Sequence, residues 1–300
     1  MPEFKIEKLA AVFRPLHFIT WISMYMLGTG ITHFLGKPLQ PRLFWLGFLW
    51  LASLLLGFFL IGDHFHTPFD RGLSGYIAAD ESSRPDSDPI ENLELYLGAA
   101  LLISAAVISI FILQQPGLAL AVVLIMFLIF FLAACLVIPG VNLAASGFGE
   151  LISSIVLILL PPAFGFWLQQ GEFHNLLALS VFPIFPLHLG MLIFLQLPGF
   201  GADLRLGNVN FLTRAGWVRG VFIHNMLIAT GYVLLGLSTL FGFPSRITLI
   251  VLSSMPLAFF LVWYLSRLER GAPTRWPELT ILSISTFFLP VYIMAYSFWI

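Results

Sequence analysis

Charged residues and cysteine are both scarce in this sequence. Lys, Arg, Asp and Glu together make up 10% of the 300 residues, whereas an ordinary soluble domain is about 25% charged. Cys135 is the only cysteine, which excludes an intramolecular disulfide framework and a Cys-rich metal site. The formal net charge of −1 leaves no basic surface for nucleic acid. Because so few residues are charged, water is excluded as the main solvent of this chain.

Long apolar runs are abundant instead. Hydrophobic residues make up 59% of the chain, and its mean hydropathy is +0.96. A helix needs roughly 20 apolar residues to cross a bilayer, and runs without period-two alternation favour helices over barrel strands. We therefore expect an all-α integral membrane protein with a single transmembrane domain over 1–300. Its nine predicted spans lie near 15–36, 43–62, 93–114, 117–138, 150–170, 174–197, 218–242, 247–266 and 279–299.

Basic residues predict the orientation of these spans. With the N-terminus in the cytoplasm, only Lys37, Arg42 and Arg246 of the 14 Lys and Arg residues fall on the opposite side. Basic loop residues favour the cytoplasmic side. We therefore expect a cytoplasmic N-terminus and an external C-terminus. The stretch before the first span lacks a small-residue cleavage site, so that span is expected to stay in the mature protein.

Acidic residues gather in two predicted cytoplasmic connections, near 63–92 and 198–217. These are the longest connections, and long loops are usually functional or disordered. Four predicted spans separate them, which suggests an old duplication of a helical unit. Carboxylates above an apolar bundle suit a ligand with a charged head and a greasy tail. The acidic residues are Asp63, Asp70, Asp80, Glu81, Asp86, Asp88, Glu91 and Asp203.

A diphosphate is one head group that these connections could bind. Its charge is offset by Mg²⁺ held on carboxylates, or by direct contacts to arginine. The 31 phenylalanines and 8 tryptophans offer an apolar lining for a tail. The arginines with this potential role are Arg71, Arg84 and Arg205.

The two connections also carry short motifs. The first runs from Gly62 through Asp63 and His66 to Asp70, and the second runs from Gly199 through Asp203 to Gly207. Further family-like stretches are Arg14-Pro15, Ser83-Arg84-Pro85, Gly147-Phe148-Gly149-Glu150-Leu151, Asn210-Phe211 and Gly216. In their order and spacing, over essentially the whole chain, these residues resemble the UbiA superfamily of intramembrane prenyltransferases, particularly the branch that makes menaquinone precursors and related lipid quinones.

The resemblance implies a nine-helix bundle that transfers a prenyl group from a polyprenyl diphosphate to an aromatic or lipid acceptor. It implies catalytic and Mg²⁺-binding roles for Asp63, Asp70 and Asp203. The residues that it implies in substrate binding are His66, Arg71, Arg84, Arg205 and Gly207.

Three motif positions depart from the family pattern: Gly62 replaces Asn, and His66 and Gly199 replace Asp. These changes leave room for only one metal ion or none. They favour, as an alternative, a catalytically inactive UbiA-like protein that binds lipid or acts as a scaffold. A transition metal bound by His64, His66, Asp63 and Asp70 is a further alternative, and a small-molecule transporter is another. Other polar residues inside spans are expected to be neutral and hydrogen-bonded in the interior: His17, His33, His188, His224, Asn225 and Glu150.

Overall fold

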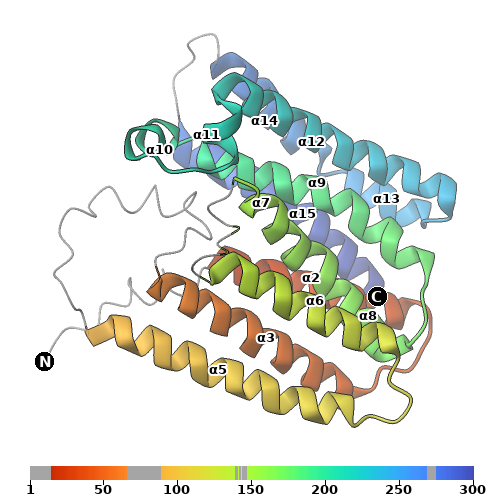
Figure 1. The fold of residues 1–300 in the computed structure, drawn as a ribbon. Helices are drawn as coiled ribbons and strands as arrows, with labels where there is room; N and C mark the ends of the chain where they lie inside the picture. The colour runs from red at the N-terminus through yellow and green to blue at the C-terminus, as the bar shows by residue number, and fades with distance from the viewer. Residues whose placement is uncertain (1–14, 66–88, 139–140, 142, 144–146, 269–274) are drawn as a thin grey trace, which may run out of the picture.

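Every regular element of the described chain is a helix (Figure 1). The computed structural model describes residues 15–65, 89–138, 141, 143, 147–268 and 275–300, and no strand occurs among them. A helix satisfies its backbone groups within one segment, which is what a lipid environment demands. The predicted all-α class is confirmed.

The helices are those that Figure 1 labels. They are α2 (Pro15–Phe34), α3 (Pro41–His64), α5 (Pro89–Leu113), α6 (Leu120–Val137), α7 (Gly149–Ser154), the π-helix η3 (Ile155–Leu159), α8 (Leu160–Gln170), α9 (Asn175–Gln196), α10 (Phe200–Leu206), α11 (Phe211–Ala215), α12 (Trp217–Ser238), the 3₁₀ helix η4 (Thr239–Phe241), α13 (Ser245–Leu252), α14 (Met255–Leu268) and α15 (Trp276–Trp299).

Seven helical segments of the described chain are long and apolar enough to cross a membrane. The pair α13 and α14, which bends by 41° at its junction, makes an eighth if it is counted as one span. All eight coincide with predicted ranges. The ninth range, 15–36, forms α2, which has 20 residues but is not among the apolar candidates. The seven are α3, Leu93–Leu113 of α5, α6, Gly149–Gln170, α9, Trp217–Phe241 and α15.

Helix α2 lies between two hydrophobic cores. Trp21 and Tyr25, one turn apart, join a core built with α3, α5 and α6. Met24, Leu27 and Ile31 join a second core built with α9 and α12 to α15. Because both faces of α2 meet protein, the helix carries buried polar residues that a lipid-facing helix would avoid.

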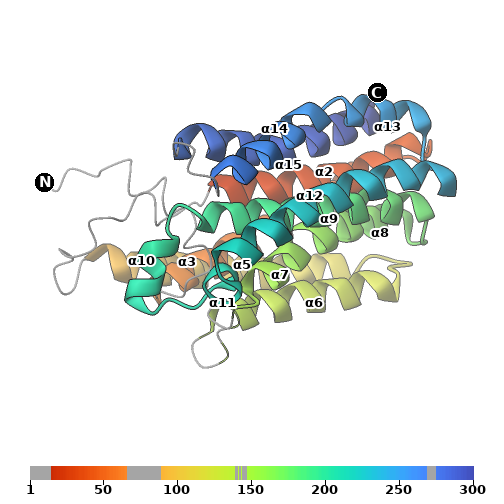
Figure 2. The ribbon, with the colours of Figure 1, turned by 90° about the horizontal axis from the view of Figure 1, so that it is seen from above.

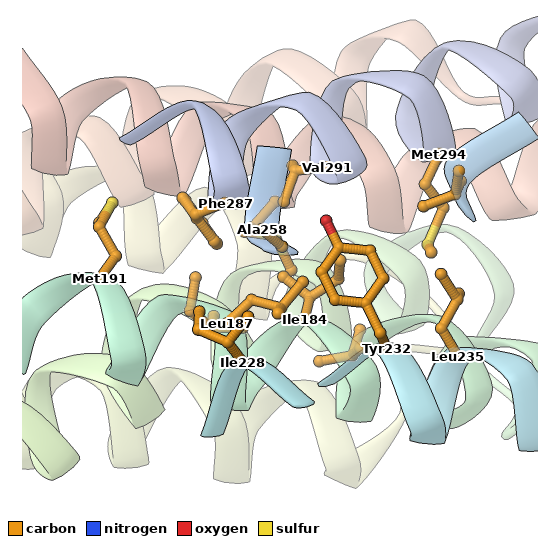
Figure 3. Packing of buried hydrophobic residues seen from close by; sticks show 14 of the residues in the cluster. Ile184, Leu187, Met191, Ile228, Tyr232, Leu235, Ala258, Phe287, Val291 and Met294 are labelled. Atoms are coloured by element: carbon orange, nitrogen blue, oxygen red, sulfur yellow. The ribbon is translucent and has the colours of Figure 1, made fainter. Parts of the chain in front are cut away.

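The second core fills the space between α9, α12, α14 and α15. Figure 3 shows Leu187 of α9, Ile228 of α12 and Phe287 of α15 packed together, with Ala258 of α14 beside them. All four side chains are almost completely buried. This half of the bundle is therefore tightly packed around these four residues.

The seam between α2 and α8 joins the two cores. A Cβ atom on Gly28 would lie 2.1 Å from the carbonyl oxygen of Pro162, so only glycine permits this approach. The turn before Pro161 and Pro162 widens into the π-helix η3. Proline has no N–H to donate, and π-helical turns commonly accommodate such interruptions.

Candidate functional site

Both motif-bearing segments lie at the same end of the bundle. In Figures 1 and 2, α10 and α11 lie at the end where α3 finishes and α5 begins, and the C-terminus lies at the other end. Asp63 is in the last turn of α3, which ends at His64. The first motif therefore begins in a helix, and the last turn of α3 fixes the position of Asp63.

Several predicted site residues lie outside the described residues. These are His66, Asp70, Arg71 and Arg84. Their implied roles in metal and substrate binding stay predictions. Within the described part of the chain, no group of three or more His, Cys, Asp or Glu residues is arranged to hold a metal ion.

The second connection contains two short helices where the sequence predicts a loop. Asp203 lies in the first turn of α10, and Gly207 ends that helix with φ of +70°, a conformation that favours glycine. The Asn208 N–H then donates to the backbone oxygen of Asp203 over 2.9 Å. Gly207 thus serves as the turn that brings Asn208 back onto α10, and the predicted substrate contact of Gly207 stays a prediction.

Both carboxylate oxygens of Asp203 accept hydrogen bonds from its own connection. The side-chain amide of Asn208 donates to Oδ1 over 2.9 Å, and that of Asn210 donates to Oδ2 over 2.9 Å. Hydrogen bonds to an ionised acceptor are stronger than neutral ones. Asp203 therefore organises the α10–α11 connection in addition to any role toward a ligand.

Asn210 also caps α11. Its Oδ1 accepts from the backbone N–H of Thr213 over 2.8 Å, and Thr213 Oγ1 accepts from the N–H of Asn210 over 2.9 Å. The reciprocal pair forms a capping box. Asn followed three residues later by Thr was the sequence signal that could have revealed this short helix.

Glu150 and Gln196 fasten α11 to the bundle. The side-chain amide of Gln196 donates to Glu150 Oε1, which also accepts from the N–H of Phe211 at 3.4 Å. Gln196 Oε1 accepts from the buried N–H of Leu212 over 3.0 Å. One set of hydrogen bonds thus connects α7, α9 and α11, and we call Glu150 and Gln196 the latch. The sequence analysis missed Gln196 and Asn208, because their partners are distant or depend on the turn at Gly207.

The arginines at this end differ in their surroundings. Arg205 is exposed on α10. Arg214 of α11 lies over the ring of Phe148, with Cζ 5.6 Å from its centroid. Arg205 is therefore accessible to an anion, as its predicted role requires, while the predicted contact itself stays a prediction.

Three of the four histidines predicted to be interior are buried, namely His17, His188 and His224, whereas the prediction is wrong for His33, which is exposed near the end of α2. His17 and His188 are 2% and 1% exposed. The hydroxyl of Ser154 and Nδ1 of His188 share a hydrogen bond over 2.9 Å. His224 and Asn225 form a similar contact over 3.0 Å. Polar groups inside a membrane bundle normally find such partners.

The fold and this polar end define a class: a multi-pass, all-helical integral membrane protein with about seven apolar spans. No protein-family model matches the chain, and no curated protein matches it significantly.

Proposed function

We propose that this protein is a divergent UbiA-like prenyltransferase that transfers a prenyl group from a polyprenyl diphosphate to an aromatic or lipid acceptor. One observation carries the proposal: Asp63 and the helix of Asp203 lie at the same end of an apolar bundle. In this proposal, nine helices cross the membrane, and the motif-bearing end faces the cytoplasm. Helix α2 crosses as an inner helix, since both its faces meet protein.

The diphosphate would be bound at the cytoplasmic end while its prenyl chain lies against the apolar helices. Asp63, Asp70 and Asp203 would hold Mg²⁺, which offsets the negative charge of the diphosphate. Each oxygen of Asp203 accepts one amide hydrogen bond, and a carboxylate has about four lone-pair sites. This donor set is therefore compatible with one shared metal ion.

The remaining site residues would bind and orient the donor. Arg71, Arg84 and Arg205 would contact the phosphates directly. His66 and Gly207 would also take part in binding the donor. The bond between the allylic carbon and the diphosphate oxygen breaks, and the diphosphate leaves with the electron pair. The acceptor then forms a bond to that carbon and loses a proton.

Binding measurements test the proposal. We expect purified protein in detergent to bind a prenyl diphosphate only with Mg²⁺ present, and Asp63→Ala and Asp203→Ala to abolish that binding. Glu172→Ala removes an exposed carboxylate outside both motifs and should leave the affinity unchanged. Wild-type affinity in both aspartate variants would contradict the proposal.

A catalytically inactive, lipid-binding or scaffold protein is the second candidate. The observation that favours it is the pair of amide hydrogen bonds from Asn208 and Asn210, which gives Asp203 a structural role that needs no metal. Stable co-purification of a partner without turnover would support this candidate. Turnover with any prenyl donor would eliminate it.

A further inference from the structure

A cavity opens between α14 and α15, away from both acidic connections in sequence. Its volume is about 320 Å³, room for about ten water-sized groups. It lies where α14 finishes and α15 begins, at the same end of the bundle as α10 (Figures 1 and 2). Its lining residues are Phe260, Tyr264, Arg275, Glu278, Leu279 and Leu282.

The lining is graded from polar to apolar along the helices. Arg275 and Glu278 stand at the start of α15, and Leu282 lies about 10 Å beyond Arg275 and about 6 Å beyond Glu278 at 1.5 Å per residue. On α14, Phe260 and Tyr264 are one turn apart, and their rings lie 6.1 Å from each other. The cavity therefore has a charged mouth at the end of the bundle and an apolar interior toward its middle.

Among the described residues that line the cavity, Arg275 and Glu278 place one positive and one negative charge at its mouth. Arg275 Nη1 and Glu278 Oε1 are 3.6 Å apart, and the side chains are 67% and 65% exposed. An ion pair that is this exposed contributes little to stability. Both groups can therefore exchange partners readily. The neighbouring Arg267 is stacked on Trp263, with Cζ 4.2 Å from the ring centroid, and does not line the cavity. Arg275 and Glu278 therefore offer a ligand one charge of each sign.

Exposed aromatic side chains lie at and beside the cavity. Phe260 and Trp263 are 50% and 48% exposed, and their rings lie 5.6 Å apart. Aromatic residues and arginine beside the end of a span are typical of the boundary between hydrocarbon and head groups. Such surroundings suit a molecule from the membrane whose polar head lies at that boundary.

We propose that this cavity binds a zwitterionic phospholipid with a primary ammonium group, of the phosphatidylethanolamine type. Its phosphate contacts Arg275, its ammonium contacts Glu278, and the first part of one acyl chain lies among Phe260, Leu279 and Leu282. An anionic lipid such as phosphatidylglycerol satisfies Arg275 but brings no cation for Glu278. This site is independent of prenyl transfer, so either proposal can fail alone.

Native mass spectrometry of the purified full-length protein tests the site, with phosphatidylethanolamine and phosphatidylglycerol supplied in equal amounts. We expect the wild type to retain more phosphatidylethanolamine, by up to about fivefold, the size that an exposed ion pair supports. Glu278→Gln should abolish this preference, and Arg275→Gln should lower the binding of both lipids. Leu282→Trp should fill the apolar part and lower both as well.

The control is Arg246→Gln, which removes an exposed arginine at the start of α13 and should change nothing. Circular dichroism would establish that each variant keeps its helices. Equal retention of both lipids by the wild type would overturn the proposal. An unchanged preference in Glu278→Gln would overturn it as well.

Discussion

The helix pair that flanks the first motif connection resembles the pair that flanks the second. Helix α3 packs against α5, and α9 packs against α12, so each connection joins two neighbours. Both pairs meet at glycines. Gly57 of α3 faces Gly98 of α5, and Gly231 of α12 faces Leu187 of α9. Between membrane helices, such close approach stabilises packing where apolar burial alone cannot.

The two pairs differ in what surrounds them. Helix α5 has the smallest buried share of the seven candidate spans, whereas α9 has the largest. The α9–α12 connection is held by the latch of Glu150 and Gln196, which reaches back to α7. The second pair is thus integrated into the bundle by buried polar contacts, and the first pair depends more on the contact between its own two helices.

Gly28→Ala should have the largest effect, because this seam serves both halves. The new Cβ would lie 2.1 Å from a backbone oxygen of α8, which cannot rotate away. Overpacking of this kind costs roughly 3 kcal/mol of the free energy of unfolding, measurable by denaturant titration in detergent. Gly236→Ala is the control, since nothing lies within 4 Å of its Cβ position. It should be neutral or stabilise the protein by up to about 1 kcal/mol.

Alanine substitutions at Gly231 and Gly57 should show whether the α9–α12 pair is packed more tightly than the α3–α5 pair. A Cβ on Gly231 would meet Leu187 Cδ2 at 2.5 Å inside the tightly packed second core. A Cβ on Gly57 would meet Leu102 Cδ2 at 2.9 Å, and that side chain lies only partly buried. We expect Gly231→Ala to cost about 2 kcal/mol and Gly57→Ala about 1 kcal/mol, by the same titration. The reverse order would contradict the proposed difference between the pairs.

Gln196→Leu should release α11 from the bundle. The change removes the acceptor of the buried Leu212 N–H and the amide that donates to Glu150. An unsatisfied buried donor costs roughly 1 to 3 kcal/mol. Hydrogen exchange at Phe211 and Leu212 should rise accordingly. Glu150→Gln keeps an acceptor oxygen and should raise exchange less, whereas unchanged exchange in Gln196→Leu would show that the latch does not hold α11.

The helices were predictable because the bilayer imposes a length and a composition on each span. The bend between α13 and α14 lies at Ser253-Ser254, just before Pro256, and the prediction of one continuous span over 247–266 did not use this local signal. Helix α2 fits its predicted range by length, yet its polarity makes sense only once two cores are seen on its faces. That information lies in tertiary contacts, which a local pattern does not carry.

The candidate site was predictable in part. The turn at Gly207 and the cap at Asn210 follow from local residue types. The partnership of Glu150 with Gln196 joins residues 46 positions apart, and no periodicity reveals such a pair. The order of the motifs therefore predicted that both connections lie at one end of the bundle, while the hydrogen bonds that shape that end needed the structure.

Ser109→Ala should have the smallest effect on the free energy of unfolding. It tests whether α5 is held to α3 by a polar contact as well as by the glycine contact. The indole N–H of Trp50 on α3 donates to Ser109 Oγ over 2.7 Å. Loss of the acceptor leaves the indole N–H of the buried Trp50 without its partner and should cost about 1 kcal/mol in the denaturant titration. Ser104→Ala is the matched control, since the Ser104 hydroxyl is exposed and bonds only within α5, to the oxygen of Ala100. Equal stability of the two variants would leave the glycine contact as the main interaction that fixes α5, whereas a loss confined to Ser109→Ala would show that this pair also uses a polar contact, as the second pair does.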